Sequence, residues 1–220
     1  MGTAPRLEEI KAKLAELPKR DVPTIRSLCK ELSVRLKEEP AEGVFHLAVQ
    51  LIEDGEWNLR HIAYELVAHH KPTMRSLDSV RLNELGKGID SWYATDTFSP
   101  YLAGPAWANG QIPDGTVQQW IDSPDLWYRR AALVATISLG RRGAPGDTER
   151  VLWVCRQLVD DRDDMVVKAL SWALRELTKT DSAAVASFLE EFQGRVSARA
   201  VRETRNKLRT GLKNPKRSAT

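Results

Sequence analysis

The chain has 220 residues, 42% of them hydrophobic and 29% charged, which is enough for a core under a well-solvated surface. This length fits one large domain or a short array of repeats. No apolar run approaches the roughly 20 residues of a membrane helix, and Cys29 and Cys155 form neither a CxxC motif nor a disulfide framework. We therefore expect a soluble, cytoplasmic protein that does not bind a membrane.

The net charge of +3 is unevenly distributed along the chain. Residues 194–220 contain nine Lys or Arg residues and a single acid, Glu203, giving +8, whereas the 24 basic and 29 acidic residues elsewhere give −5. A basic C-terminal segment on a mildly acidic body suggests contact with a polyanion. The alternative is a solvated helix with a frayed end. We expect residues 213–220 to form a basic, disordered tail.

Apolar residues recur at helical spacing along nearly the whole chain, and strand-like alternation is absent. The first apolar stripes predict five helices, over residues 7–17, 25–36, 44–51, 57–66 and 77–85. Lys71-Pro72 is expected to end the fourth of them. Gly and Pro residues then cluster around short helical pieces, between which we expect Trp107 and Trp120 to pack. Regular helices resume over residues 126–139, 148–158, 165–177, 183–192 and 197–212.

About eleven helices joined by short turns predict an all-α, antiparallel array. A loose internal repeat supports this prediction, because an apolar-x-x-basic motif opens three of the helices. The motifs are Trp57-x-x-Arg60, Trp127-x-x-Arg130 and Met165-x-x-Lys168, at spacings of 70 and 38 residues. HEAT-like repeats are about 40 residues long. We expect residues 1–212 to form a single HEAT-like solenoid domain whose concave face is lined by the basic residues of these motifs.

The stretch GIDSWYATD, residues 88–96, combines a large aromatic residue with a carboxylate. Trp92 and Asp96 are four residues apart, so on a helix they share one face. A carboxylate beside a tryptophan is unfavourable in a core but suits a cationic ligand, which both groups attract. The alternative is an exposed aspartate beside a half-buried tryptophan.

Two further segments place an aromatic residue beside a charged one, DLWYRRAAL at 125–133 and VVKALSWALREL at 166–177. In the second segment, Lys168, Trp172 and either Arg175 or Glu176 follow one another by one helical turn. Three such pairings favour a shared binding site. Neither a metal nor a cofactor is expected, because His69-His70 has no HExxH context and no glycine-rich nucleotide loop follows a strand.

The order W-x-x-x-D, W-x-x-R-A-A and K-A-x-x-W-x-L-R-E resembles that of the AlkD-like DNA alkylation repair glycosylases, which are built from HEAT-like helical repeats. The earlier segment DVPTIRSLCKEL is also similar to that family, and the resemblance runs from about Val22 to Lys207. One departure is Ser91, where the family often has a second aromatic residue.

This resemblance implies a role for each motif residue. Asp96 matches the catalytic carboxylate, and Trp92 and Trp172 match the aromatic residues that contact the damaged nucleotide. Arg130 matches a basic residue placed at the DNA backbone near the lesion. Further DNA contacts are expected from the other cations of these helices, Arg60, Lys168 and Arg175.

The activity that the resemblance implies is monofunctional hydrolysis of the N-glycosidic bond of N3- or N7-alkylated purines in double-stranded DNA, by a monomer and without capture of the base in a pocket. The residues suit this chemistry, because a cationic base leaves easily and a carboxylate stabilises the positive charge that develops on the sugar. Two alternatives stay open. One is a catalytically silent HEAT-like protein that binds damaged or branched DNA, and the other is a protein–protein adaptor.

Overall fold

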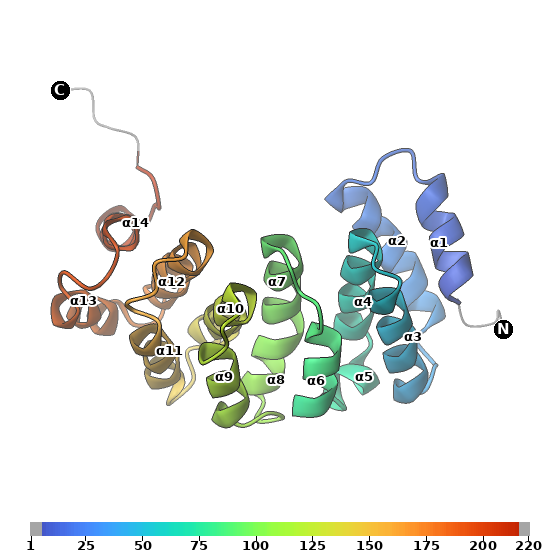
Figure 1. The fold of residues 1–220 in the computed structure, drawn as a ribbon, viewed down its shortest axis with the longest axis horizontal. Coiled ribbons are helices and arrows are strands. Elements are labelled where there is room, and N and C mark those ends of the chain that lie inside the picture. The colour runs from blue at the N-terminus through green and yellow to red at the C-terminus, as the bar shows by residue number, and fades with distance from the viewer. Residues whose placement is uncertain (1–5, 216–220) are drawn as a thin grey trace. The chain divides into compact units, whose positions relative to one another are not determined.

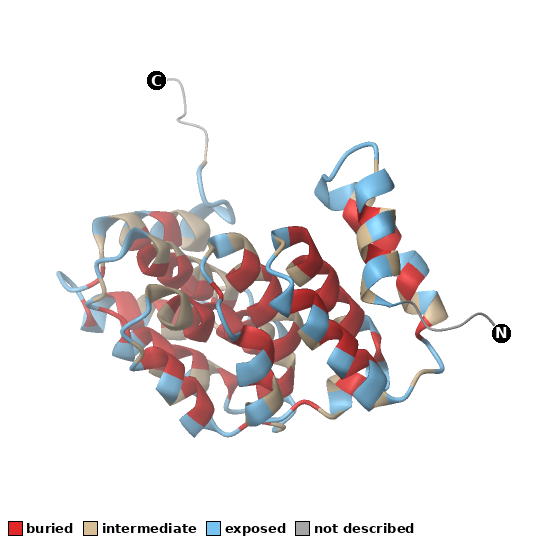
Figure 2. Ribbon diagram, turned by 45° about the vertical axis from the view of Figure 1, so that its right-hand side comes forward, coloured by how far each residue is buried: buried red, intermediate tan, exposed pale blue. Residues whose placement is uncertain are grey.

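The computed structural model describes residues 6–215, and within them the chain forms helices and no strands (Figure 1). The all-α prediction is confirmed: these helices pack against one another, as in a helical repeat array. None of them is long and apolar enough to span a membrane. Figure 2 shows that most helices present a buried stripe on one side and exposed residues on the other, as amphipathic patterning predicts.

The elements of the described chain are α1 (Leu7–Glu16), α2 (Val22–Arg35), α3 (Ala41–Glu53), α4 (Trp57–His69), α5 (Lys71–Arg75), α6 (Ser79–Gly86), α7 (Trp92–Phe98), the π-helix η1 (Ser99–Ala103), α8 (Gly104–Ala108), α9 (Asp114–Ile121), α10 (Leu126–Arg142), α11 (Asp147–Gln157), α12 (Asp164–Leu177), α13 (Ser182–Glu191) and α14 (Ala198–Thr210).

The chain divides into two compact units. Unit 1 comprises Met1–Ile89 and Tyr101–Ile112, and unit 2 comprises Asp90–Pro100 and Pro113–Thr220. The prediction that residues 1–212 form a single domain stays a prediction. Of the tail predicted over residues 213–220, the part from 216 onward lies outside the described residues.

Unit 1 is built around α3 and α4, against which α1, α2, α5 and α6 pack. Helix α2 begins at Val22, three residues before the predicted apolar stripe, because Asp21 caps it. The Asp21 carboxylate accepts hydrogen bonds from the Thr24 backbone N–H at 3.0 Å and from the Thr24 hydroxyl at 2.7 Å. Tyr64 of α4 is fully buried, and its hydroxyl donates to the Leu85 carbonyl at 3.0 Å. Trp107 is fully buried, as expected for the short pieces of the middle segment.

The segment after α4 differs from its prediction. Lys71-Pro72 was expected only to end a helix, whereas it begins α5. Proline is well tolerated in the first turn of a helix, because the N–H that it lacks has no intrahelical partner there. His70 caps this turn, since its Nδ1 accepts from the Thr73 N–H at 3.3 Å. The same proline can therefore end one helix and open the next.

Unit 2 is built around α10, which packs against α7, α9, α11 and α12, while α14 packs against α12. Helices α10 and α12 approach closely at Gly140, where an added Cβ would lie 3.6 Å from the backbone nitrogen of Leu177. Phe98 at the end of α7 packs edge-on against the buried Trp120 of α9, with ring centroids 6.1 Å apart. These contacts hold α10 against α12 and α7 against α9.

The three apolar-x-x-basic motifs each fall in the first turn of a helix. Trp57 is the first residue of α4, Trp127 the second of α10 and Met165 the second of α12. The basic residue of each motif is therefore the fourth or fifth residue of its own helix. Its contacts differ from helix to helix, as described below.

Candidate active site

Helix α7 carries Trp92 and Asp96, and Ser91 begins it. The Ser91 hydroxyl accepts from the Ala94 N–H at 3.4 Å, which makes Ser91 the N-cap of the helix. Trp92 is the first helical residue and Asp96 lies one turn later, so the two share a face as predicted. The residue that departs from the family pattern thus has a structural role at this position.

Both side chains on this face reach the surface to different degrees. Trp92 is 54% exposed, and the side chain of Asp96 is 22% exposed. An exposed tryptophan leaves a large apolar area in water, which is common at binding surfaces. The Asp96 carboxylate beside it is partly buried but keeps some exposure to solvent.

Arg130 of α10 holds the Asp96 carboxylate with two parallel hydrogen bonds. Its Nε donates to Oδ1 at 3.0 Å and its Nη2 donates to Oδ2 at 2.8 Å. Such a bidentate pair fixes both the position and the plane of the carboxylate. Helix α10 starts upstream at Asp125, whose carboxylate accepts from the Trp127 N–H at 2.8 Å. This cap fixes where α10 begins. Arg130 lies about one turn further along the helix, where its side chain reaches Asp96 of α7.

The third nitrogen of Arg130 is also engaged. Its Nη1 donates to the backbone carbonyl of Met165, in the first turn of α12. One guanidinium therefore connects α7, α10 and α12, and its side chain is only 6% exposed. All three nitrogens have protein acceptors, so this geometry favours a role in positioning Asp96 over direct contact with a DNA phosphate.

The arrangement leaves Asp96 able to interact with a ligand. Each carboxylate oxygen accepts one hydrogen bond from Arg130 and retains a further lone pair. A negative charge that is already oriented needs no reorganisation when a positive charge develops nearby. Chemically, the site can stabilise a cation or orient a water molecule.

On α12, Lys168 and Trp172 lie one turn apart on a partly exposed face. Lys168 Nζ is 2.6 Å from Asp164 Oδ2, and both side chains are substantially exposed. Exposed pairs of this kind contribute about 0–1 kcal/mol, so Lys168 can exchange Asp164 for a phosphate at little cost. Trp172 is half-buried.

Arg175 and a residue missed in the sequence, Glu203, belong to one buried network between α12 and α14. The Ser171 hydroxyl donates to Glu203 at 2.7 Å and accepts from Arg175 Nε at 3.2 Å. Lys213 Nζ lies 3.4 Å from the same carboxylate. Burial lowers the pKa of Arg175, which nevertheless stays protonated. The one signal for Glu203 in the sequence was that it is the single acid of the basic C-terminal segment.

The pKa of Glu203 reflects two opposing effects. Burial favours the neutral acid and would raise the pKa. The hydrogen bond from Ser171 and the charges of Lys213 and Arg175 outweigh burial, so the pKa is lowered. Glu203 is therefore an ionised buried group that ties α14 to the helix carrying Trp172.

Arg60, the first of the predicted DNA contacts, belongs to unit 1, whereas the residues described above belong to unit 2. Its Nη1 donates to the Lys87 carbonyl at 3.0 Å and to the Tyr64 hydroxyl at 3.1 Å. These bonds tie α4 to the end of α6. Arg60 thus has a structural role in its own unit, and its predicted contact with DNA stays a prediction.

The outward face of α14 is cationic. A cleft of about 670 Å³ is lined by the arginines of this face, Arg202, Arg205 and Arg209, together with Ala198, Val201 and Asn206. The opposite face of the helix packs inward, with Ala200 and Thr204 buried. The helical part of the basic C-terminal segment therefore presents its arginines to solvent, as contact with a polyanion would require.

Both cysteines are buried, and burial raises the pKa of Cys29 and of Cys155 to about 12. Neither forms a thiolate at neutral pH, so neither is suited to nucleophilic chemistry. Within residues 6–215, no three His, Cys, Asp or Glu side chains are grouped so that they could hold a metal ion.

The chain matches a known protein family. A family model described as DNA alkylation repair enzyme matches residues 20–208. This range spans most of the chain and contains Trp92, Asp96, Arg130, Lys168 and Trp172. No curated protein matches the chain.

Proposed function

The chain belongs to the DNA alkylation repair enzyme family, and we propose that it acts as a DNA glycosylase on purines alkylated at N3 or N7. Alkylation at either nitrogen makes the base cationic, so the base departs without a general acid. The enzyme must mainly stabilise the positive charge that develops on the deoxyribose as the glycosidic bond breaks.

The observation that carries this proposal is the bidentate pair of Asp96 and Arg130. It supplies an oriented carboxylate that remains partly open to solvent, beside an exposed tryptophan. In the proposed reaction, Asp96 stabilises the oxocarbenium-like sugar and orients the attacking water. Arg130 is a positioning residue that keeps both carboxylate oxygens fixed.

Trp92 and Trp172 are proposed to contact the damaged nucleotide. A tryptophan face attracts a cation, and each contact contributes about 0.5–2 kcal/mol, depending on desolvation. The high exposure of Trp92 supports this role, because the ring is available without rearrangement of the protein core. It also supports excision at the protein surface, without capture of the base in a closed pocket.

The cations near these residues are proposed to hold the DNA backbone. Lys168 is exposed and weakly paired, and the arginines of α14 face solvent. Arg175 is more buried, and its Nε lies 3.9 Å from Glu203 Oε2, so its proposed contact with the DNA backbone depends on how the Glu203 network holds it. Arg60 would act from unit 1. Contacts of this kind position the DNA without reading its sequence. The protein is proposed to act as a monomer, without a metal or other cofactor.

A different repair reaction, transfer of the alkyl group to a cysteine, is disfavoured by the residues themselves. Such a transfer requires an accessible thiolate. Cys29 and Cys155 are buried, and the pKa of each is raised to about 12. Hydrolysis of the glycosidic bond needs neither of them.

The experiment that tests the proposal is incubation of the purified protein with methylated double-stranded DNA, followed by chromatography of the released bases. We expect free 7-methylguanine and 3-methyladenine, with abasic sites left in the strand. If neither base is released while the protein binds damaged or branched DNA, the catalytically silent reading replaces the proposal. If it does not bind DNA at all, the adaptor reading does.

A further inference from the structure

A cleft in unit 1 has the character of an anion site. It has a volume of about 690 Å³ and is lined by one face of α2 together with Glu65 and His69 of α4 and Tyr101. The cationic residues that line it are Arg26 and Lys30 of α2 and Lys37, which lies two residues beyond the end of that helix. We call this the α2 cleft.

Arg26 is anchored inside the α2 cleft while remaining open to solvent. Its Nη2 donates to the Tyr101 hydroxyl at 3.0 Å, and its Nε lies 3.5 Å from Glu65 Oε1. Glu65 is only 7% exposed, whereas Arg26 is 54% exposed. Because Tyr101 and Glu65 already hold the Arg26 guanidinium, binding an anion would cost little additional side-chain conformational entropy.

The neighbouring lysines reinforce the positive charge. Lys30 lies one turn beyond Arg26, and within the described residues no carboxylate is within salt-bridge distance of it. Lys37 contacts Glu38 at 3.6 Å, but both of these side chains are highly exposed, so the pair neutralises little. Val34 is exposed between the two lysines. Cations interrupted by a small apolar side chain suit a phosphate backbone with its sugars.

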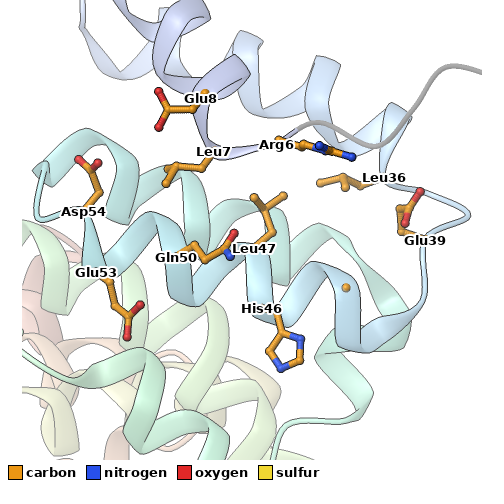
Figure 3. Close-up of a pocket in the computed structure, with 11 residues that line it drawn as sticks. Arg6, Leu7, Glu8, Leu36, Glu39, His46, Leu47, Gln50, Glu53 and Asp54 are labelled. Carbon is orange, nitrogen blue, oxygen red and sulfur yellow. The ribbon is translucent and has the colours of Figure 1, made fainter.

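The two lysines of α1 are neutralised. On α1, Lys11 lies 2.7 Å from Asp54 and Lys13 lies 2.7 Å from Glu31. The second cleft of this region, between α1 and α3, has the opposite character (Figure 3). Its lining includes four carboxylates, from Glu8, Glu39, Glu53 and Asp54. Of these two clefts, the α2 cleft is therefore the one that complements a polyanion.

We propose that the α2 cleft binds backbone phosphates of the DNA on which the protein acts, with Arg26 as the fixed contact and Lys30 and Lys37 as its neighbours. This inference rests on the proposed function for its ligand, since a repair enzyme must hold its DNA substrate. It adds the α2 cleft to the DNA contacts already proposed for Arg60 in unit 1 and for the residues around Asp96 in unit 2.

The test compares two double variants with the same charge change. Lys30→Gln/Lys37→Gln alters the α2 cleft, and Lys11→Gln/Lys13→Gln alters α1. The affinity of each for an undamaged, fluorescently labelled duplex is measured by anisotropy over a range of salt concentrations. Each lost phosphate contact reduces the slope of log K against log salt by about 0.9. We expect the α2 variant to lose about two units of slope and the α1 variant to keep the slope of the parent. Equal slopes for the two double variants would overturn the inference.

A second arm separates this inference from the proposed function. Release of 7-methylguanine is measured under single-turnover conditions with increasing protein. We expect the α2 variant to keep the maximal rate and to need more protein to reach half of it. If the parent releases no base but the α2 variant loses slope, the proposed reaction fails and the cleft assignment stands. If the parent releases base and the slope is unchanged, the cleft assignment alone fails.

Discussion

The guanidinium of Arg130 donates a hydrogen bond to each oxygen of the Asp96 carboxylate, with Nε 3.0 Å from Oδ1 and Nη2 2.8 Å from Oδ2. The two residues are 34 positions apart and lie on different helices. The carboxylate is therefore oriented by the folded protein before any DNA arrives. Such preorganisation is how a fixed charge stabilises a transition state more than it stabilises the ground state.

Replacing Arg130 by lysine tests this positioning role. Lysine keeps the positive charge but lacks the fork that holds both oxygens. We expect the maximal rate of base release by Arg130→Lys to fall on the order of tenfold to a hundredfold, somewhat less than for loss of the carboxylate charge itself. The salt slope of DNA binding should stay unchanged. A slope reduced by about one unit would mean instead that Arg130 contacts a phosphate directly.

Trp172→Ala should weaken the binding of methylated DNA and slow the release of the base. The substitution removes an aromatic contact with the damaged nucleotide but leaves the charge of Asp96 in place. Loss of a cation–π contact of about 0.5–2 kcal/mol corresponds to an affinity for methylated DNA that is about 2- to 30-fold weaker. The matched control is Trp57→Ala, which removes an exposed tryptophan from unit 1. Equal effects of the two variants on affinity and single-turnover rate would contradict the assignment of Trp172.

Glu203→Gln should destabilise the protein in a pH-dependent way. The pKa of Glu203 is lowered below its ordinary 4.5 in the folded state, so its stabilising effect is fully present above about pH 4.5 and is lost as the pH falls through the lowered value. At pH 7 the free energy of unfolding should fall by about 1.5–3 kcal/mol, the usual loss for a charged hydrogen bond.

The measurement is urea unfolding of Glu203→Gln and the parent at several pH values, with the exposed Glu190→Gln as the control. The difference between Glu203→Gln and the parent should narrow as the pH drops below 4.5. A difference that stayed constant down to pH 3 would show that the carboxylate charge is not what stabilises the contact between α12 and α14.

Much of the local structure could be predicted from the sequence. Helical periodicity indicates where the main helices lie, and the i, i+4 spacing places Trp92 and Asp96 on one face. These features depend on neighbouring residues alone. The start of α5 at Lys71-Pro72 was missed because a proline that ends one helix and a proline that opens the next give the same signal.

The long-range contacts could not be predicted in this way. The pairing of Arg130 with Asp96 depends on how α10 packs against α7, and its bond to the Met165 carbonyl depends on the start of α12. The resemblance assigned Arg130 to the DNA backbone. The positioning role is favoured by its three hydrogen bonds to protein acceptors, which the sequence does not reveal. The burial of Glu203 results from the packing of α14 against α12, and the residues around it in the sequence do not predict it.

The most direct test of the central claim is the single-turnover release of 7-methylguanine and 3-methyladenine by Asp96→Asn, compared with the parent protein. Asparagine is nearly isosteric, so folding and DNA binding should be preserved while the charge opposite the sugar is lost. We expect the rate to fall on the order of 10²–10³-fold, or about 3–4 kcal/mol, with the lower end favoured because a cationic base leaves readily. If Asp96→Asn releases either base as fast as the parent, Asp96 is not the catalytic group.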